Sequence, residues 1–222
     1  MAKLILFRHF KSQWNLENRF TGWTDVPLCR EGKEKVPEIA EKLAEAKIDV
    51  VYTSPLIRNM HSCLLVLEKG EKYPIFRHFE GRMEKWGKFH DLKKNYLPVF
   101  VNEALNERYY GDLQGLNKKE IIEKYGEEQV HLWRRGYKNT PPGGENLADV
   151  VKRVKPFHEK FIEKDLKEGK NVLVVASHNS LRALIKEIEK ISDEDIINVE
   201  VPYAGIIEYE YREGVYHIKN KT

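Results

Sequence analysis

A chain of 222 residues can bury the core of one α/β domain or of two small domains at most, and we expect a single domain over 1–222. With 38 Lys and Arg interspersed among 35 Asp and Glu, the chain carries no basic arm of the kind that binds nucleic acid. The two cysteines form no metal or redox motif, and neither a signal peptide nor a membrane-spanning apolar run is visible, so the expected location is the cytoplasm.

The first element is an uninterrupted apolar run from Leu4 to Phe7, which is typical of a strand buried on both faces of a mostly parallel sheet. Arg8 and His9 follow directly, so a cation and an imidazole leave the end of a central strand together. Ligands of open α/β sheets bind outside the carboxyl ends of the strands, which makes both residues site candidates. Ser12 and Asn15 come next, in the turn and first helical residues where an anion would be held.

The following elements alternate between loop, helix and strand. A loop is expected from Leu16 to Trp23, and an amphipathic helix over 31–46 that begins or kinks near Pro37. A second parallel strand is expected from Ile48 to Thr53. Arg58 lies on the turn and helix after this strand, and therefore at the same sheet edge as His9.

The stretch 70–101 is harder to interpret. A strand could run from Tyr73 to Phe79, whereas 80–94 is charged and aromatic, with Trp86 and Phe89 at roughly helical spacing. We expect a surface excursion that is packed by its own aromatic side chains.

Glycines punctuate the stretch from Leu105 to Lys118, which favours a loop. Two short helices are expected over 120–135, and a long helix over 147–167 that is kinked at Pro156. Arg134 and Arg135 end the second short helix, where two cations could either complement the helix dipole or bind an anion.

A second buried strand is expected from Val172 to Ala176, and a helix from Leu181 to Ile188. The turn over 177–180 between them has backbone amides that could cup a phosphate. Alternating residues from Ile206 onward predict a closing hairpin at the sheet edge.

Three of these stretches resemble motifs of the histidine phosphatase superfamily, in its 2,3-bisphosphoglycerate-dependent phosphoglycerate mutase branch. Arg8 to Asn15 is similar to R-H-G-E-S-x-W-N, although Phe10 and Lys11 replace the glycine and the glutamate. The stretch 18–23 matches N-R-F-T-G-W, and 105–118 matches L-N-E-R-x-Y-G-x-L-Q-G-x-N-K. The resemblance implies a three-layer α/β/α sandwich with a mostly parallel central sheet, in which 70–101 is an insertion.

The resemblance also implies roles for individual residues. His9 would be the nucleophile, which suits the one strand-end residue able to act near neutral pH without a separate base. Arg8 and Arg58 would bind the phosphoryl group, and Glu107 would give and take the substrate proton. A simple ion pair with the neighbouring arginine is the structural alternative for Glu107. The implied substrate contacts are Ser12, Asn15, Thr21, Gly22, Arg108, Tyr109, Tyr110, Lys118, Arg134, Arg135 and Asn179.

The most serious departure from the family lies at Ser177 and His178. The family has A-H-G-N-S-L-R where this chain has Ala176-Ser177-His178-Asn179-Ser180-Leu181-Arg182, so Ser177 replaces the second histidine. If the backbone keeps the family's path, Ser177 occupies the catalytic position. A shift of one residue would bring His178 there instead, and we expect this shift.

The resemblance implies a phosphoglycerate mutase of glycolysis and gluconeogenesis that interconverts 3-phosphoglycerate and 2-phosphoglycerate through a phosphohistidine. Its substrate would be a small phosphorylated three-carbon acid, its primer 2,3-bisphosphoglycerate, and its chemistry metal-free, because no carboxylate cluster suggests magnesium. No nucleic-acid or membrane partner is expected, and a homo-oligomer is compatible with the sequence.

Two alternatives stay open. A phosphomonoester phosphatase would use the same core with water as the acceptor. An inactive phosphometabolite-binding protein would explain Phe10, Lys11 and the exchange at Ser177 and His178 together, but not the joint presence of His9, Arg58 and Glu107.

Overall fold

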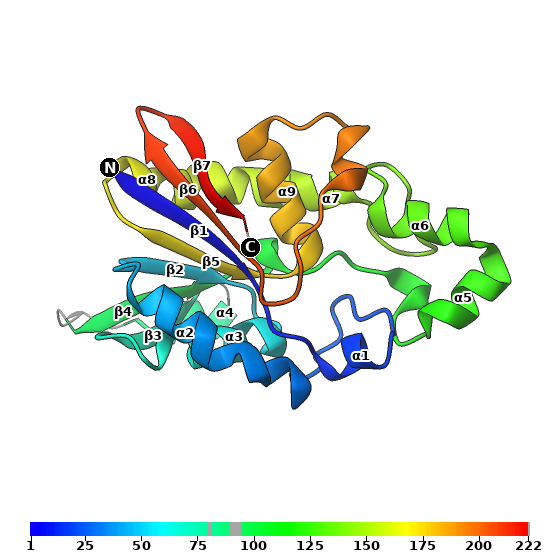
Figure 1. The fold of residues 1–222 in the computed structure, drawn as a ribbon, viewed down its shortest axis with the longest axis horizontal. Helices are drawn as coiled ribbons and strands as arrows, with labels where there is room; N and C mark the ends of the chain where they lie inside the picture. The colour runs from blue at the N-terminus through cyan, green and yellow to red at the C-terminus, as the bar shows by residue number, and fades with distance from the viewer. Residues whose placement is uncertain (80, 89–94, 222) are drawn as a thin grey trace.

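The computed structural model of the chain describes residues 1–79, 81–88 and 95–221, and Figure 1 shows its ribbon. Across these residues a seven-stranded sheet has the order β3-β4-β2-β5-β1-β6-β7. The first five strands pair in parallel, and β6 and β7 form an antiparallel hairpin beside β1. The strands are β1 Ala2–Arg8, β2 Val50–Thr53, β3 Tyr73–His78, β4 Tyr96–Val101, β5 Val172–Ala176, β6 Ile206–Arg212 and β7 Val215–Lys221.

The apolar runs noted in the sequence form the middle of this sheet. In β1, Leu4 pairs with Val172 of β5 on one side and with Tyr209 of β6 on the other. Every residue of β5 is buried, as expected for a strand with helices on both faces. The buried centre of the sheet therefore carries Arg8 and His9 to its carboxyl edge.

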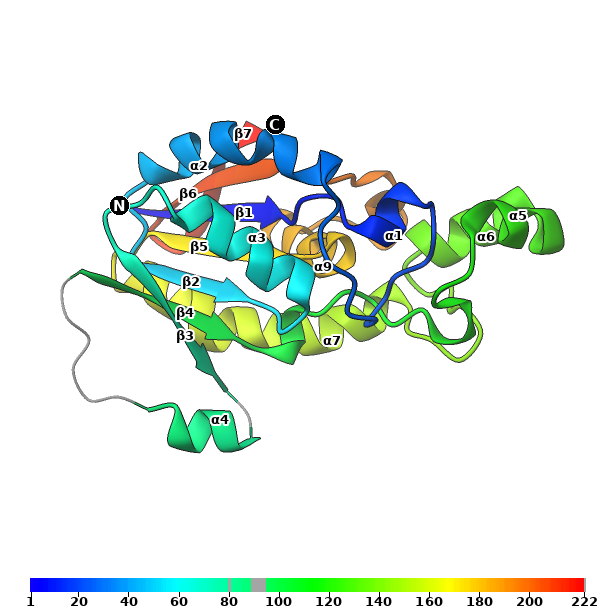
Figure 2. The ribbon, with the colours of Figure 1, turned by 90° about the horizontal axis from the view of Figure 1, so that it is seen from below.

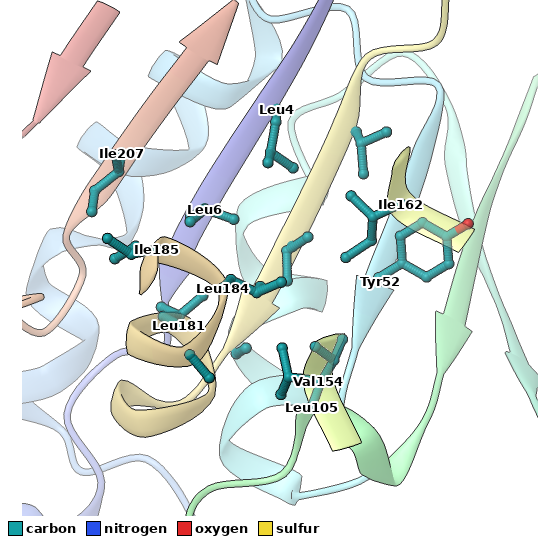
Figure 3. Close-up of a cluster of buried hydrophobic side chains, with 14 of the residues drawn as sticks. Leu4, Leu6, Tyr52, Leu105, Val154, Ile162, Leu181, Leu184, Ile185 and Ile207 are labelled. Carbon is teal, nitrogen blue, oxygen red and sulfur yellow. The ribbon is translucent and has the colours of Figure 1, made fainter. Parts of the chain in front are cut away.

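Helices cover both faces of the sheet, as Figure 2 shows for α2 and α3. The opposite face packs against α7, α8 and α9, whose apolar side chains meet Leu4 and Leu6 in the cluster of Figure 3. The helices are α1 Gln13–Leu16, α2 Val36–Ala44, α3 Ile57–Leu67, α4 Gly81–Trp86, α5 Lys118–Tyr125, α6 Glu127–Arg135, α7 Leu147–Phe157, α8 Glu163–Lys167 and α9 His178–Glu189. The three-layer α/β/α architecture with a mostly parallel sheet confirms the predicted fold class.

Helices α5 and α6 project from the end of the molecule toward which the parallel strands point (Figures 1 and 2). A small apolar cluster ties them to the preceding loops through Phe20, Leu113, Ile121, Val130 and Trp133. This projection places the start of α5 and the end of α6 beside the carboxyl edge of the sheet.

Two prolines lie in helices at the positions noted in the sequence. Pro37 lies in the first turn of α2, where its missing N–H leaves no helical bond unmade. Pro156 lies inside α7, and a π-helical segment, His158–Ile162, follows before α8. The single helix expected over 147–167 with a kink at Pro156 is instead divided into α7, this π-helical segment and α8.

The strand that could run from Tyr73 to Phe79 is found as β3, Tyr73–His78, whereas the surface excursion expected over 70–101 is wrong for the C-terminal end of that range. Both β3 and β4 are strands of the central sheet, and β4 lies between β3 and β2, with Val99 paired to Val51 and to Phe76. The sequence analysis missed β4 because Pro98 lies in its middle, and proline argues against an interior strand.

Between these strands, the expected packing by aromatic side chains is not found at Trp86 of α4, whose exposure is 76%. Phe89 lies outside the described residues.

Candidate active site

A cavity of about 300 Å³ opens at the carboxyl ends of β1 and β5. It is lined by cations, a few aromatic rings and two carboxylates. The lining residues are Arg8, His9, Asn15, Arg19, Phe20, Thr21, Gly22, Arg58, Glu107, Tyr110, Lys118, Arg134, Arg135, His178, Asn179, Glu200, Pro202 and Tyr203. Most of the residues singled out from the sequence are thus brought together around one cavity.

His9 lies directly after β1, and its side chain is 2% exposed. Its Nδ1 is 2.6 Å from the carbonyl oxygen of Phe10. Because a carbonyl can only accept, Nδ1 carries the proton and the lone pair is on Nε2. Burial, followed by the charges of Arg58 and Arg8, holds the pKa of His9 well below its usual value. At neutral pH, His9 is therefore a neutral imidazole with Nε2 as its nucleophilic atom.

Two arginines flank His9, and each is fixed by backbone carbonyls. Arg8 donates from Nη1 to Val201 O at 2.5 Å, and its guanidinium lies 3.7 Å from the centroid of the Tyr203 ring. Arg58 of α3 donates to Thr24 O at 3.0 Å and to Gly22 O at 2.6 Å.

Burial lowers the pKa of Arg58 to about 10, so the group remains charged at neutral pH. Arg8 and Arg58 together supply fixed positive charge that can bind an anion.

The loop that carries Gly22 is held in a shape that requires glycine. Gly22 has φ +53°, and a Cβ there would lie 2.0 Å from Gln114 Oε1. The same oxygen accepts from Trp23 N at 2.8 Å. The match at 18–23 therefore corresponds to a loop that is pinned against the 105–118 segment.

Phe10 and Lys11, the two departures in the first motif, do not line the cavity. The Phe10 ring is fully buried in the core, 5.3 Å from Phe7 between ring centroids, and its backbone N–H donates to Ser62 Oγ at 3.1 Å. The large side chain therefore points away from the site.

Glu107 rests against the N-terminus of α9. Its Oε1 accepts from the backbone N–H of Arg108 at 2.7 Å and from that of Asn179 at 3.2 Å. The side chain is buried, and these two backbone donors fix the position of its Oε1. Glu107 is therefore positioned by hydrogen bonds to the backbone, and the ion pair with Arg108 considered as an alternative is replaced by one of these bonds.

The far end of the cavity is formed by the projecting helices. Lys118 begins α5, and Arg134 and Arg135 end α6. Burial, with the nearby charges of Arg134, Arg8 and Arg135, lowers the pKa of Lys118 to about 8. Such crowding of like charges is costly unless an anion accompanies it, so this end is suited to an anionic group.

The turn after β5 places His178 at the cavity and Ser177 away from it. Ser177 is the N-cap residue of α9, its backbone N–H donates to Ser180 Oγ at 3.2 Å, and its hydroxyl accepts from Asn59 Nδ2 at 3.1 Å. Ser177 does not line the cavity, whereas His178, the first residue of the helix, does. The helix thus begins three residues earlier than the expected start at Leu181, because Ser177 caps it.

Three of the residues expected as substrate contacts support the wall from behind or lie outside it. Ser12 is buried as the N-cap of α1 and bonds Asn15 Oδ1 at 2.9 Å. Arg108 is fully buried and donates to Arg134 O at 2.6 Å and to Tyr110 Oη at 3.2 Å. Tyr109 is 40% exposed and is not among the lining residues.

The sequence analysis did not assign five lining residues: Arg19, Phe20, Glu200, Pro202 and Tyr203. The first two lie inside the matched loop at 18–23. The others precede β6, which is antiparallel to β1 and therefore starts at the edge where β1 ends. The sequence predicted a hairpin at the sheet edge but did not pair it with β1, so its leading loop was not assigned to the site.

Within the described ranges, no group of three or more His, Cys, Asp or Glu side chains is arranged to hold a metal ion. Among the helices of the same residues, none has both the length and the apolar character needed to span a membrane.

Comparison with known sequences gives consistent matches. A sequence model described as histidine phosphatase superfamily (branch 1) matches residues 4–95 and 88–221. The 2,3-bisphosphoglycerate-dependent phosphoglycerate mutase of Gloeothece citriformis is 46% identical over 219 residues, covering 95% of this chain and 94% of that protein. The protein of the same name from Methanococcus vannielii is 41% identical over 216 residues, covering 96% and 92%.

Solved structures share the fold. Bacillus stearothermophilus YhfR superimposes with a TM-score of 0.78 at 20% identity, covering 98% of this chain and 95% of that one. The native structure of a mycobacterial glucosyl-3-phosphoglycerate phosphatase gives 0.76 at 19% identity, covering 99% and 97%. Together with the sequence matches, which extend over nearly the whole length, these findings show that the chain belongs to the histidine phosphatase superfamily.

Proposed function

We propose that this protein is a 2,3-bisphosphoglycerate-dependent phosphoglycerate mutase, which interconverts 3-phosphoglycerate and 2-phosphoglycerate. The observation that carries the proposal is a single cavity with a neutral nucleophilic histidine at one end and a second group of cations at the other. The names of relatives 41–46% identical over nearly the whole chain support the same reaction. As an enzyme of glycolysis and gluconeogenesis it would work in the cytoplasm.

The reaction proceeds through phosphorylated His9. The free hydroxyl of 3-phosphoglycerate attacks the phosphorus, the N–P bond to Nε2 breaks as the new P–O bond forms, and Glu107 takes the hydroxyl proton. The bisphosphate formed then gives its other phosphoryl group back to Nε2, and Glu107 returns the proton to the leaving oxygen. This leaves 2-phosphoglycerate, and free 2,3-bisphosphoglycerate primes the resting histidine in the same way.

Charge stabilisation is divided between the two ends of the cavity. Arg8 and Arg58, joined by His178, meet the charge that spreads over the transferring phosphoryl oxygens. Tyr110, Lys118 and the arginine pair of α6 hold the second anionic group of the substrate, where guanidinium offers two donors in a fork. The remaining substrate contacts come from Asn15, Thr21, Gly22 and Asn179, which line the cavity. Ser12 and Arg108 support the lining from behind, and Tyr109 lies beside it.

A phosphatase of the same superfamily is the second candidate, favoured by the solved relative that carries that name. A phosphatase needs only the His9 end, because water accepts the phosphoryl group. The cationic far end favours the mutase, in which a second anionic group must be held through both half-reactions.

The deciding experiment is phosphoryl labelling. Incubation with labelled 2,3-bisphosphoglycerate should give an acid-labile, alkali-stable phosphoprotein that is absent in His9→Ala. A wild-type protein that takes up no label would exclude the phosphohistidine mechanism and favour the binding-protein alternative.

The reaction type and the metal requirement are tested together. With 3-phosphoglycerate and a trace of bisphosphate, 2-phosphoglycerate should appear much faster than inorganic phosphate, and EDTA should not change the rate. Dominant phosphate release would establish the phosphatase instead, and loss of activity on chelation would show that a metal takes part.

A further inference from the structure

Glu200 is a carboxylate inside a cavity that is built for anions, and the proposed mechanism gives it no role. Its Oε1 forms an ion pair with the guanidinium of Arg135, and its Oε2 lies 3.0 Å from His178 Nε2. The carboxylate therefore occupies two side chains, Arg135 and His178, that we propose bind the ligand.

The hydrogen-bond roles in this cluster are fixed by chemistry. Burial, then the charges of Arg8 and Arg135, lowers the pKa of His178 well below its usual value, so the ring is neutral with a single N–H. A carboxylate only accepts, so Nε2 carries that proton and donates to Glu200. Arg135 Nη1 lies 3.3 Å from Nδ1 and 3.1 Å from Nε2, and because Nε2 carries the proton, only Nδ1 can accept from it. With Glu200 in place, the N–H of His178 is already used.

The backbone and the side chain of Glu200 are held differently. The next residue, Val201, is fully buried, and its carbonyl oxygen accepts the 2.5 Å hydrogen bond from Arg8. The Glu200 side chain, in contrast, is 55% exposed. Because the carboxylate is already largely hydrated, its ion pair is weak, and it can turn into solvent at little cost. This turn needs no movement of the backbone that positions Arg8.

We propose that Glu200 is a specificity-determining residue, an internal counter-anion that the second anionic group of the ligand displaces from Arg135. Its displacement also frees the N–H of His178 to donate to the transferring phosphoryl group. The carboxylate returns to Arg135 when the product leaves, which prevents a strongly cationic cavity from holding an anion too tightly. This inference rests on the proposed function, because it takes the ligand to be a phosphorylated acid.

The test is a double-mutant cycle on the dissociation constant of 3-phosphoglycerate, measured by titration calorimetry. Glu200→Gln should tighten binding about tenfold, a typical size for coupling between two sites. The same substitution made together with Arg135→Gln should change binding less than about twofold relative to Arg135→Gln alone, because the contested guanidinium is gone. Glu194→Gln is the matched control, since it removes the same charge from an exposed position on the same connection and should have no effect.

Each other outcome overturns the assignment. Equal tightening with and without Arg135 would mean that Glu200 acts only through its long-range field. Weaker binding in Glu200→Gln would mean that Glu200 holds Arg135 in its binding orientation. If the wild type and Glu200→Gln both fail to bind 3-phosphoglycerate, the proposed function fails together with this inference, whereas measurable but equal binding removes only the role of Glu200.

Discussion

The reactive tautomer of His9 is set by the carbonyl of its own neighbour, Phe10, and not by a separate carboxylate. The arrangement needs no acidic residue beside the nucleophile, where an anionic side chain would repel a phosphate. The same turn sends the Phe10 ring into the core, so a bulky residue is compatible with an open cavity.

At the residue scale, His178 and Ser177 can be separated by activity. Because His178 lines the cavity and Ser177 does not, His178→Ala should lower turnover about a hundredfold, or ~3 kcal/mol of transition-state stabilisation. Binding of 3-phosphoglycerate should change little, since several other groups hold the substrate. Steady-state kinetics of both alanine variants decide the matter, and a large loss of turnover in Ser177→Ala with normal turnover in His178→Ala would reverse the assignment.

Lys118 gives the site a pH dependence of known sign. Its pKa near 8 means that the ammonium loses its proton as the pH rises through about 8, and one charged contact to the ligand is lost with it. Affinity for 3-phosphoglycerate should therefore fall by about tenfold between about pH 7 and pH 9.5, the size of one charged hydrogen bond. Calorimetric titrations across this range should show a much flatter profile for Lys118→Arg, and an equal decline in both proteins would assign the effect to another group.

At the scale of elements, the turn between β5 and α9 serves structure and site together. Ser177 caps the helix and accepts a hydrogen bond from Asn59, while the next three residues supply His178, a backbone N–H for Glu107 and the Ser180 hydroxyl. Stability and activity therefore depend on adjacent residues of one short segment.

Ser177→Ala should reduce the free energy of unfolding by about 1 kcal/mol, the usual contribution of an N-cap side chain. Urea denaturation followed by circular dichroism measures this directly. An unchanged midpoint would mean that the cap is not stabilising and that Ser177 is present for another reason.

The elements that could be predicted are those with a local sequence signal, either an apolar run that indicates a strand buried on both faces or a proline that marks a helix boundary. The runs at Leu4 and Val172 gave β1 and β5, and Pro37 marked the start of α2. Strand β4 was missed because Pro98 interrupts it, and the start of α9 because the capping role of Ser177 depends on the folded turn. The motif residues of the site could be assigned by resemblance, but Glu200 and Tyr203 could not, since only the pairing of β6 with β1 brings their loop to His9.

At the scale of the whole molecule, the cavity is closed by the part that lies farthest from the sheet. Helices α5 and α6 meet the rest of the chain through a small apolar cluster, yet they carry three of the cations. A bound anion would therefore link this projection to the sheet edge.

Adding 3-phosphoglycerate should slow amide hydrogen exchange in 118–135 severalfold or more, because ligand binding there raises the free energy of local opening. Exchange in β5 should change little, since that strand is already buried. Mass spectrometry with and without ligand tests this, and unaltered exchange over 118–135 would show that the ligand does not engage the projection.

The position of β1 in the sheet has a consequence for synthesis. Its neighbours, β5 and β6, lie near the other end of the chain, with Leu4 beside Val172 and Tyr209. A chain emerging from the ribosome therefore carries the apolar run before Arg8 unpaired until β5 and β6 have been made, and closing such long loops slows folding. The nucleophile is synthesised well before the strands that surround it, so the nascent domain is exposed to aggregation, and inactive, until those strands follow.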